Sequence, residues 1–405
     1  MTRHGKDAAV TLSAHTNSPS QDTPPTPLLD VNRQNEPLRE EIVEAIAAVV
    51  ESGAFVKGPD VRELEAEIAE ACHAEHAVGC ASGSDALLLP LMALGIGPGD
   101  EVVLPSFTFF ATAGSVWRLG AKPVFADILP DTFNLDPEDV ARKITPATKA
   151  ILPVHLFGQS VDMAALRTVA DEHGLPIIED AAQAIGAQHD GQPVGALGLA
   201  GCFSFYPTKN LGGLGDGGMV TTNDAQLAER MRVLCDHGQN PRYHHSLVGM
   251  NSRLDTIQAA ALRVKLRHLT SYADGRTRHA ARYEKALRSA QLSGVLTTPV
   301  EAPGAQSVWN QYTVRVHGGQ RDALQRYLGD RKIGSAIYYP IPLHLQECFA
   351  PLGYRHGDLP HTERAAEEVL SLPVFPELRP EEQQRVIDGV LGFAAEQTTG
   401  SRLAA

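Results

Sequence analysis

The sequence predicts an α/β fold: a large domain with a mostly parallel central sheet, followed by a smaller C-terminal α+β domain. From residue 77 onward, short apolar stretches typical of buried strands alternate with stretches of helical periodicity. This alternation favours a parallel sheet that is covered by helices. The chain has 405 residues, of which 43% are hydrophobic, so it can bury a large core and form two domains.

The elements are expected in the following order along the chain. Residues 1–25 are polar and rich in Thr, Ser and Pro, which predicts a disordered tail. The periodicity then predicts two helices, at 38–52 and 61–72. Strands are predicted at 77–80, 101–105, 123–126, 150–154, 177–180 and 219–222. A long charged helix at 264–287, a strand at 311–316 and a helix at 363–370 follow. We therefore place the large domain at 26–265 and the small domain at 266–405.

Charge and composition exclude several classes of protein. The net charge of -13 argues against a nucleic-acid surface, which needs a basic stripe. No apolar run reaches the roughly 20 residues needed to span a bilayer, and the N-terminus lacks a signal peptide, so we expect a cytoplasmic protein without membrane contact. The five cysteines are widely spaced and the histidines show no metal-ligand spacing, so neither a disulfide framework nor a metal site is expected.

A lysine and an acid carry the main chemical signal. Asp180 ends an apolar stretch, and the carboxyl ends of strands are where open α/β sheets place their ligands. Lys209 follows another apolar stretch in the run Ser-Phe-Tyr-Pro-Thr-Lys-Asn, and a glycine-rich loop comes directly after it. Pyridoxal phosphate needs a lysine amine for its aldehyde and a carboxylate for its protonated ring nitrogen. Either residue alone is more often a solvated lysine or a helix cap, but the pair predicts a pyridoxal phosphate site.

Other residues supply the remaining parts of such a site. Gln183 follows Asp180 by three residues and is a candidate donor to the phenolate oxygen of the ring. Ser204 and the amides of Ser84 and Asp85, at the start of a helix, are candidates for binding a phosphate. An ordinary Ser/Asp cap on a core helix is the alternative for that helix start. Phe109, which follows the strand ending at Pro105, is the candidate for stacking on the ring.

The ordered series of motifs closely resembles the DegT-type (DegT/StrS) sugar aminotransferases. Over roughly residues 27–395 it consists of Ala-Ser-Gly-Ser-Asp-Ala-Leu, Pro-Ser-Phe-Thr-Phe, Pro-Val-His-Leu-Phe-Gly-Gln, Glu-Asp-Ala-Ala-Gln-Ala, Ser-Phe-Tyr-Pro-Thr-Lys-Asn and Asn-Ser-Arg-Leu-Asp. The resemblance implies a fold type I enzyme that depends on pyridoxal 5'-phosphate and forms a homodimer with shared active sites. It also implies amino transfer, usually from L-glutamate, to a nucleotide-linked keto sugar.

Carried over residue by residue, the resemblance makes Lys209 the Schiff-base lysine and supports the cofactor contacts named above. Asn251 matches an asparagine that reaches the phosphate across the dimer interface. Arg253, Tyr338 and His344 match positions that contact substrate in some members. Related dehydratases carry His at the Schiff-base position, so Lys209 favours transamination.

Alternatives remain at the level of the substrate. The stretch from Tyr243 to Arg253 looks more like members that act on 3-keto sugars than like those acting at the 4-position. Cyclitol aminotransferases share the same motifs, so a cyclitol acceptor, or another pyridoxal phosphate reaction, stays open. A noncatalytic regulator on the same scaffold is disfavoured by the presence of Lys209, Asp180 and Ser204 together.

Overall fold

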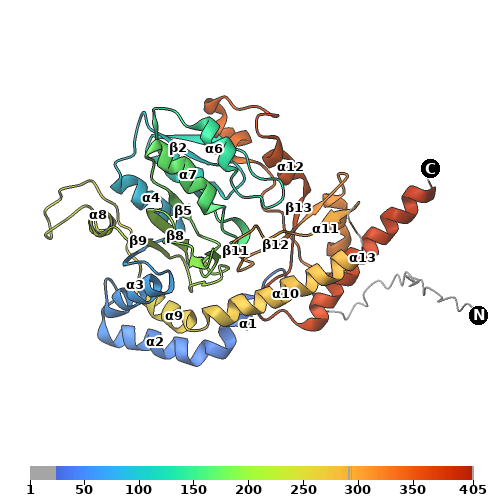
Figure 1. The fold of residues 1–405 in the computed structure, drawn as a ribbon. Coiled ribbons are helices and arrows are strands. Elements are labelled where there is room, and N and C mark those ends of the chain that lie inside the picture. The colour runs from blue at the N-terminus through green and yellow to red at the C-terminus, as the bar shows by residue number, and fades with distance from the viewer. Residues whose placement is uncertain (1–23, 291, 293, 404–405) are drawn as a thin grey trace, which may run out of the picture.

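The computed structural model describes residues 24–290, 292 and 294–403, and the side chains up to residue 397 within these ranges. The predicted disordered tail lies outside the described residues, except for Pro24 and Pro25. Figure 1 shows a layered body with a helix-flanked sheet, and a second group of strands and helices formed by the C-terminal part of the chain. Among the described helices, none is both long and apolar enough to cross a bilayer.

The central sheet is built from two hydrogen-bonded groups of strands. One group has the order β1 (His76–Cys80), β9 (Gly218–Thr222), β8 (Ala200–Ser204) and β5 (Ile178–Asp180), and the other has β3 (Lys122–Ala126), β2 (Glu101–Pro105) and β4 (Thr148–Ile151). Parallel bridges from Ile151 to Ile177 and from Val154 to Asp180 join the two groups. β9 runs antiparallel to both of its neighbours, whereas the β2–β3, β2–β4 and β5–β8 pairs are parallel. The predicted mostly parallel sheet is confirmed.

Helices cover both faces of this sheet because alternate residues of each strand point to opposite sides. Val102 and Leu104 pack in the core with α4 (Gly83–Ala93), α5 (Phe110–Arg118) and α8 (Ala225–Cys235). Val103, between them, packs in the core with α6 (Pro137–Lys143) and α7 (Met163–His173). A third core contains Phe203 of β8 and Met219 of β9 together with α3 (Pro59–Ala71) and α9 (Thr256–Leu266).

The C-terminal part differs from its prediction at two places. The expected helix at 264–287 is interrupted, since α9 ends at Leu266 and α10 spans Leu269–Ser289. The expected helix at 363–370 ends at Glu368 in α12 (Pro360–Glu368), and the next residues form β13 (Val369–Leu372). Pairing with β12 (Tyr312–Val316) explains this change, because a backbone partner across the sheet outweighs local helix propensity. The domain division near residue 265 stays a prediction.

A second, antiparallel sheet belongs to this part of the chain. Its order is β10 (Leu296–Thr297), β12 and β13, and it shares a core with α10, α11 (Arg321–Asp330) and α13 (Pro380–Leu403). The remaining elements are α1 (Val31–Asn35), η1 (Glu36–Leu38), α2 (Arg39–Ser52), η2 (Leu156–Gly158), β6 (Gln188–His189), β7 (Gln192–Pro193), β11 (Ala305–Gln306), η3 (Leu343–Leu345) and η4 (Glu347–Leu352).

Candidate active site

Asp180 lies where the prediction placed it, at the carboxyl end of β5. Its side chain is buried, and two donors hold it: the Thr112 hydroxyl donates to Oδ2 at 2.8 Å and the Ala182 amide donates to Oδ1 at 3.2 Å. The Thr108 hydroxyl lies 3.0 Å from that of Thr112, so a short chain of hydroxyl groups ends on the carboxylate. The orientation of the Asp180 carboxyl is therefore fixed by the first turn of α5 and by its own loop.

Lys209 interacts electrostatically with Asp180, although the two residues follow different strands. Burial raises the pKa of Asp180, and the hydrogen bonds from Thr112 and Ala182 and the charge of Lys209 oppose that rise. Burial lowers the pKa of Lys209 to about 8, and Asp180 opposes that fall. Among the described residues, no hydrogen bond holds the Lys209 ammonium. The site thus combines an amine whose pKa is lowered by burial with a buried acid, a combination that enzymes use for chemistry near neutral pH.

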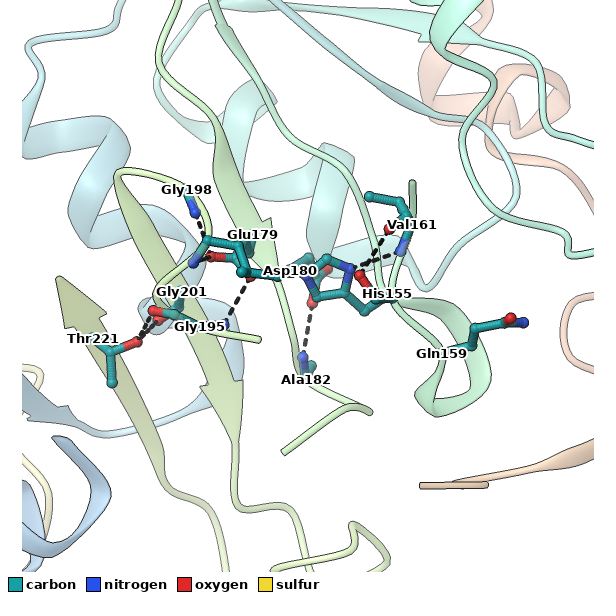
Figure 2. A network of polar contacts seen from close by, with 12 residues as sticks. His155, Gln159, Val161, Glu179, Asp180, Ala182, Gly195, Gly198, Gly201 and Thr221 are labelled. Atoms are coloured by element: carbon teal, nitrogen blue, oxygen red, sulfur yellow. Dashed lines mark hydrogen bonds and ion pairs between the residues drawn. The ribbon is translucent and has the colours of Figure 1, made fainter. Parts of the chain in front are cut away.

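Glu179 and His155 form a rigid support on the other side of β5 (Figure 2). The carboxylate of Glu179 accepts amide hydrogen bonds from Gly195, Leu197 and Gly198, at 2.7 to 2.9 Å. His155 Nδ1 accepts from the Val161 amide, so the ring proton sits on Nε2, which donates to Glu179 at 2.9 Å. The His155 amide also donates to the Asp180 carbonyl at 3.0 Å. Together these bonds fix the strand end that carries Asp180.

The phosphate candidates meet at the start of α4. The cap of this helix is Ser82, whose hydroxyl accepts from the Asp85 amide at 3.1 Å. The Asp85 amide, which was predicted to bind the phosphate, donates to the Ser82 cap in this arrangement instead. The amide of Ser84 belongs to the first turn, which has no intrahelical partner. A Cβ added to Gly83 would lie 2.5 Å from that of Ser204, so the glycine lets the helix start approach the Ser204 hydroxyl.

Gln183 and Phe109 lie around Tyr339. The Phe157 amide donates to Gln183 Oε1 at 2.7 Å, which turns the side-chain NH2 group toward the Tyr339 hydroxyl, 3.2 Å away. One of the two N–H donors of that group remains for a ligand. Phe109 is 58% exposed, and its ring centroid lies 6.2 Å from that of Tyr339. An exposed aromatic ring beside a half-buried one is consistent with the predicted stacking role.

The predicted substrate contacts are distributed over different parts of the fold. Tyr338 is half-buried beside Tyr339. His344 is buried, and its two ring nitrogens lie 2.7 Å from the Ser106 hydroxyl and 3.1 Å from the Glu363 carboxylate. Both nitrogens are occupied by protein partners, so this geometry does not support the predicted direct contact of His344 with substrate. Its position links the end of β2 to α12.

Asn251 and Arg253 lie on the segment after α8, where Arg253 donates to Asn251 Oδ1 at 2.6 Å. No hydrogen bond or ion pair within the described residues connects this pair to Lys209 or Asp180. The hydroxyl of the intervening Ser252 donates to the Asp85 carboxylate at 2.9 Å. The segment is thus anchored beside the start of α4, while Asn251 itself is exposed.

Sequence reasoning missed Thr112 and Tyr339. Thr112 lies in the first turn of α5, just after the predicted Phe109, and only the fold shows that its hydroxyl reaches Asp180. Tyr339 is the neighbour of the predicted Tyr338, and nothing local distinguishes the two tyrosines. Only the fold shows that Tyr339 faces Gln183, and burial raises the pKa of its hydroxyl, which keeps it a neutral hydrogen-bonding group.

Comparisons with known proteins identify the family of the chain. The family model described as "DegT/DnrJ/EryC1/StrS aminotransferase family" matches residues 36–391. A "pleiotropic regulatory protein" of Geobacillus stearothermophilus is 52% identical over 367 residues, which are 91% of this chain and 98% of that protein. A UDP-N-acetyl-3-dehydro-α-D-glucosamine 3-aminotransferase of Acidithiobacillus ferrooxidans is 48% identical over 361 residues, 89% of this chain and 95% of that protein.

A solved structure extends the likeness to three dimensions. The crystal structure of S. venezuelae DesV in complex with a ketimine intermediate superposes with a TM-score of 0.88 at 47% identity, and covers 92% of this chain and 99% of that one. Both the resemblance and the fold that it implied are confirmed. The chain belongs to the DegT/DnrJ/EryC1/StrS aminotransferase family, and it is a pyridoxal 5'-phosphate-dependent aminotransferase of fold type I.

Proposed function

We propose that this enzyme transfers the amino group of L-glutamate to the 3-keto carbon of a nucleotide-linked sugar. The observation that carries the proposal is the pairing of a desolvated Lys209 amine with the buried Asp180 carboxyl. The choice of acceptor draws support from the Acidithiobacillus relative, whose name specifies a 3-dehydro nucleotide sugar. The donor rests on the family resemblance, and a cytoplasmic location belongs to the same proposal.

The residues present fit the cofactor. Asp180 would accept from a protonated ring nitrogen, and the free N–H of Gln183 would meet the phenolate oxygen. Ser204 and the helix start made accessible by Gly83 would hold the phosphate, and Phe109 would cover one face of the ring. When bound, pyridoxal phosphate supplies an aldehyde that receives the amino group and a ring that draws electrons from the reacting carbon.

The protein's own part in the reaction is to position groups and move protons. With a pKa of about 8, Lys209 is an amine that readily loses its proton near neutral pH. Its Nζ would take a proton from the α-carbon of glutamate in the first half-reaction, and it would return a proton to the acceptor carbon of the keto sugar in the second. Asp180 stays fixed by Thr112 and Ala182 throughout, which keeps negative charge at one defined point.

A homodimer with shared sites belongs to the same proposal. The segment after α8 extends away from the body (Figure 1) and exposes large apolar side chains, with Tyr243 75% and Val248 92% exposed. Phe55 and Val56, 47% and 49% exposed, lie next to this segment through the bridge from Val56 to Asp255. We infer that a second copy of the chain covers these side chains, because exposed apolar patches are sites of protein–protein interaction. A second copy on this face would bring Asn251 toward the partner's cofactor phosphate.

The test is a two-stage assay of the purified enzyme with pyridoxal phosphate. L-Glutamate alone should convert the visible band of the lysine-bound cofactor to that of the aminated cofactor, and a 3-keto nucleotide sugar should then restore it with an amino sugar as product. Lys209→Ala is the control and should do neither. Turnover of a 4-keto sugar but not of a 3-keto sugar, or of a keto cyclitol in preference to both, would overturn the proposed acceptor.

A further inference from the structure

Asp236 is the centre of a small charged cluster at the end of α8. Asp236 is 8% exposed, and its carboxylate binds three side chains. Oδ2 pairs with Lys57 and accepts a hydrogen bond from the Gln239 side-chain amide at 3.1 Å. Oδ1 pairs with Arg253 at 3.1 Å. An antiparallel bridge joins the Asp236 backbone to that of Asn251. The hydrogen bond and charge of Lys57 hold the pKa of Asp236 below its usual range, so it remains a carboxylate.

The consequence of this cluster is a defined orientation of the Asn251 amide. A guanidinium has N–H donors and no acceptor, so the Asn251 atom that faces Arg253 at 2.6 Å must be the oxygen Oδ1. The NH2 group of Asn251 therefore points away from Arg253. Because the Asp236 carboxylate holds Arg253 on its other side, the guanidinium cannot turn without losing an ion pair.

We propose that Asp236 is a positioning residue that, through Arg253, keeps the Asn251 amide turned so that only donors face a phosphate on the partner subunit. This inference rests on the proposed function, which assigns Asn251 to the partner's cofactor phosphate. A phosphate is an acceptor, so the flipped amide would present oxygen to oxygen and lose the contact. Lys57, clamped by the same carboxylate, adds a second cation to this face.

A positioning role and a purely electrostatic role of Asp236 predict opposite changes in the affinity for phosphate. Removing the Asp236 carboxylate leaves Lys57 and Arg253 without their counter-ion, which by Coulomb's law should tighten the binding of any nearby phosphate. If Asp236 acts by positioning, its removal must weaken binding, because Arg253 and the Asn251 amide become free to rotate.

The experiment measures the dissociation constant of pyridoxamine 5'-phosphate, which binds without a covalent bond to Lys209, by equilibrium dialysis of the intact dimer. Asp236→Ala should raise this constant by roughly fivefold. Asn251→Ala should raise it further, and the double variant should equal Asn251→Ala alone. Pyridoxamine, which lacks the phosphate, should bind all variants equally. Arg253→Met removes the same ion pair from its other end, so it should raise the dissociation constant as Asp236→Ala does.

Glu101→Ala is the matched control. The side chains of Glu101 and Asp236 are similarly buried, at 13% and 11% exposed, and each pairs with a lysine that is about half exposed. Glu101→Ala should leave the dissociation constant unchanged. Tighter or unchanged binding in Asp236→Ala, or additive effects of Asp236→Ala and Asn251→Ala, would overturn the inference. If Asn251→Ala itself binds normally, the role of Asn251 in the proposed function fails. If only the Asp236 variants bind normally, that function stands and the positioning role fails.

Discussion

Replacing Lys209 by Met should stabilise the cofactor-free enzyme at neutral pH. Burial lowers the pKa of Lys209 from 10.5 to about 8, so holding a charged ammonium in the folded chain costs free energy. At about 1.4 kcal/mol for each pKa unit, the cost is about 3 kcal/mol below pH 8. Met keeps an unbranched apolar side chain without that charge, so Lys209→Met should recover most of this amount.

The pH dependence of this gain follows from proton linkage. Between pH 8 and 10.5, the unfolded chain still binds a proton at Lys209 that the folded chain has released. The free energy of unfolding of the wild type therefore rises with pH in this window. The advantage of Lys209→Met should be full below pH 8 and should disappear toward pH 10.5.

Urea unfolding of both cofactor-free proteins from pH 6 to 10.5, followed by circular dichroism, measures this difference. Lys122→Met serves as a control for loss of a lysine, since Lys122 is half-exposed and paired with Glu101. A Lys209→Met protein that is less stable than the wild type at pH 7, or a gain that does not change with pH, would refute the reasoning.

Three further predictions concern single residues. Lys265 is also buried with a pKa lowered to about 8, so Lys265→Met should show the same pH-dependent gain in urea unfolding while keeping transaminase activity; loss of activity would contradict this. Thr112→Val removes a hydrogen bond worth about 1.5 to 3 kcal/mol to the ionised Asp180. Because this raises the pKa of Asp180, the acid limb of the rate profile should move to higher pH, and an unmoved limb would exclude the role. Gly83→Ala places a Cβ 2.5 Å from that of Ser204, so the helix start must shift. The affinity for pyridoxamine 5'-phosphate should then fall by roughly tenfold or more, with little change for pyridoxamine, and equal losses for both ligands would refute a phosphate-specific effect.

The sequence was sufficient to predict the positions of those candidate residues that lie at strand ends. Asp180 ends β5, and Ser204 ends the neighbouring strand β8. Because these two strands are parallel, their ends meet at one edge, and the loop after β8 returns Lys209 to the same place. The order of the motifs along the chain then identified the family without knowledge of any side-chain position.

Features that depend on distant partners could not be predicted. The residues Val369 and Leu370 have helical periodicity, yet pairing with β12 makes them a strand. His344 reads as a free substrate ligand, yet Ser106, 238 residues earlier in the chain, occupies one of its ring nitrogens. The amide of Asp85 reads as a free helix-start donor until the cap by Ser82 is known. In each case a neighbour supplied by folding, rather than the residue itself, decides what remains available.

The two adjacent acids of β5 show how the structure separates a functional carboxylate from a structural one. Glu179 and Asp180 point to opposite sides of the strand, and both are buried. Glu179 binds three amides and His155, which uses about the full accepting capacity of a carboxylate. Asp180 has only the hydroxyl of Thr112 and the amide of Ala182, so it keeps accepting capacity that no described residue fills. Burial without full pairing costs stability, and a ligand that completes the pairing would recover that cost. This difference, more than the position of either acid in the sequence, favours Asp180 over Glu179 as the proposed partner of the cofactor.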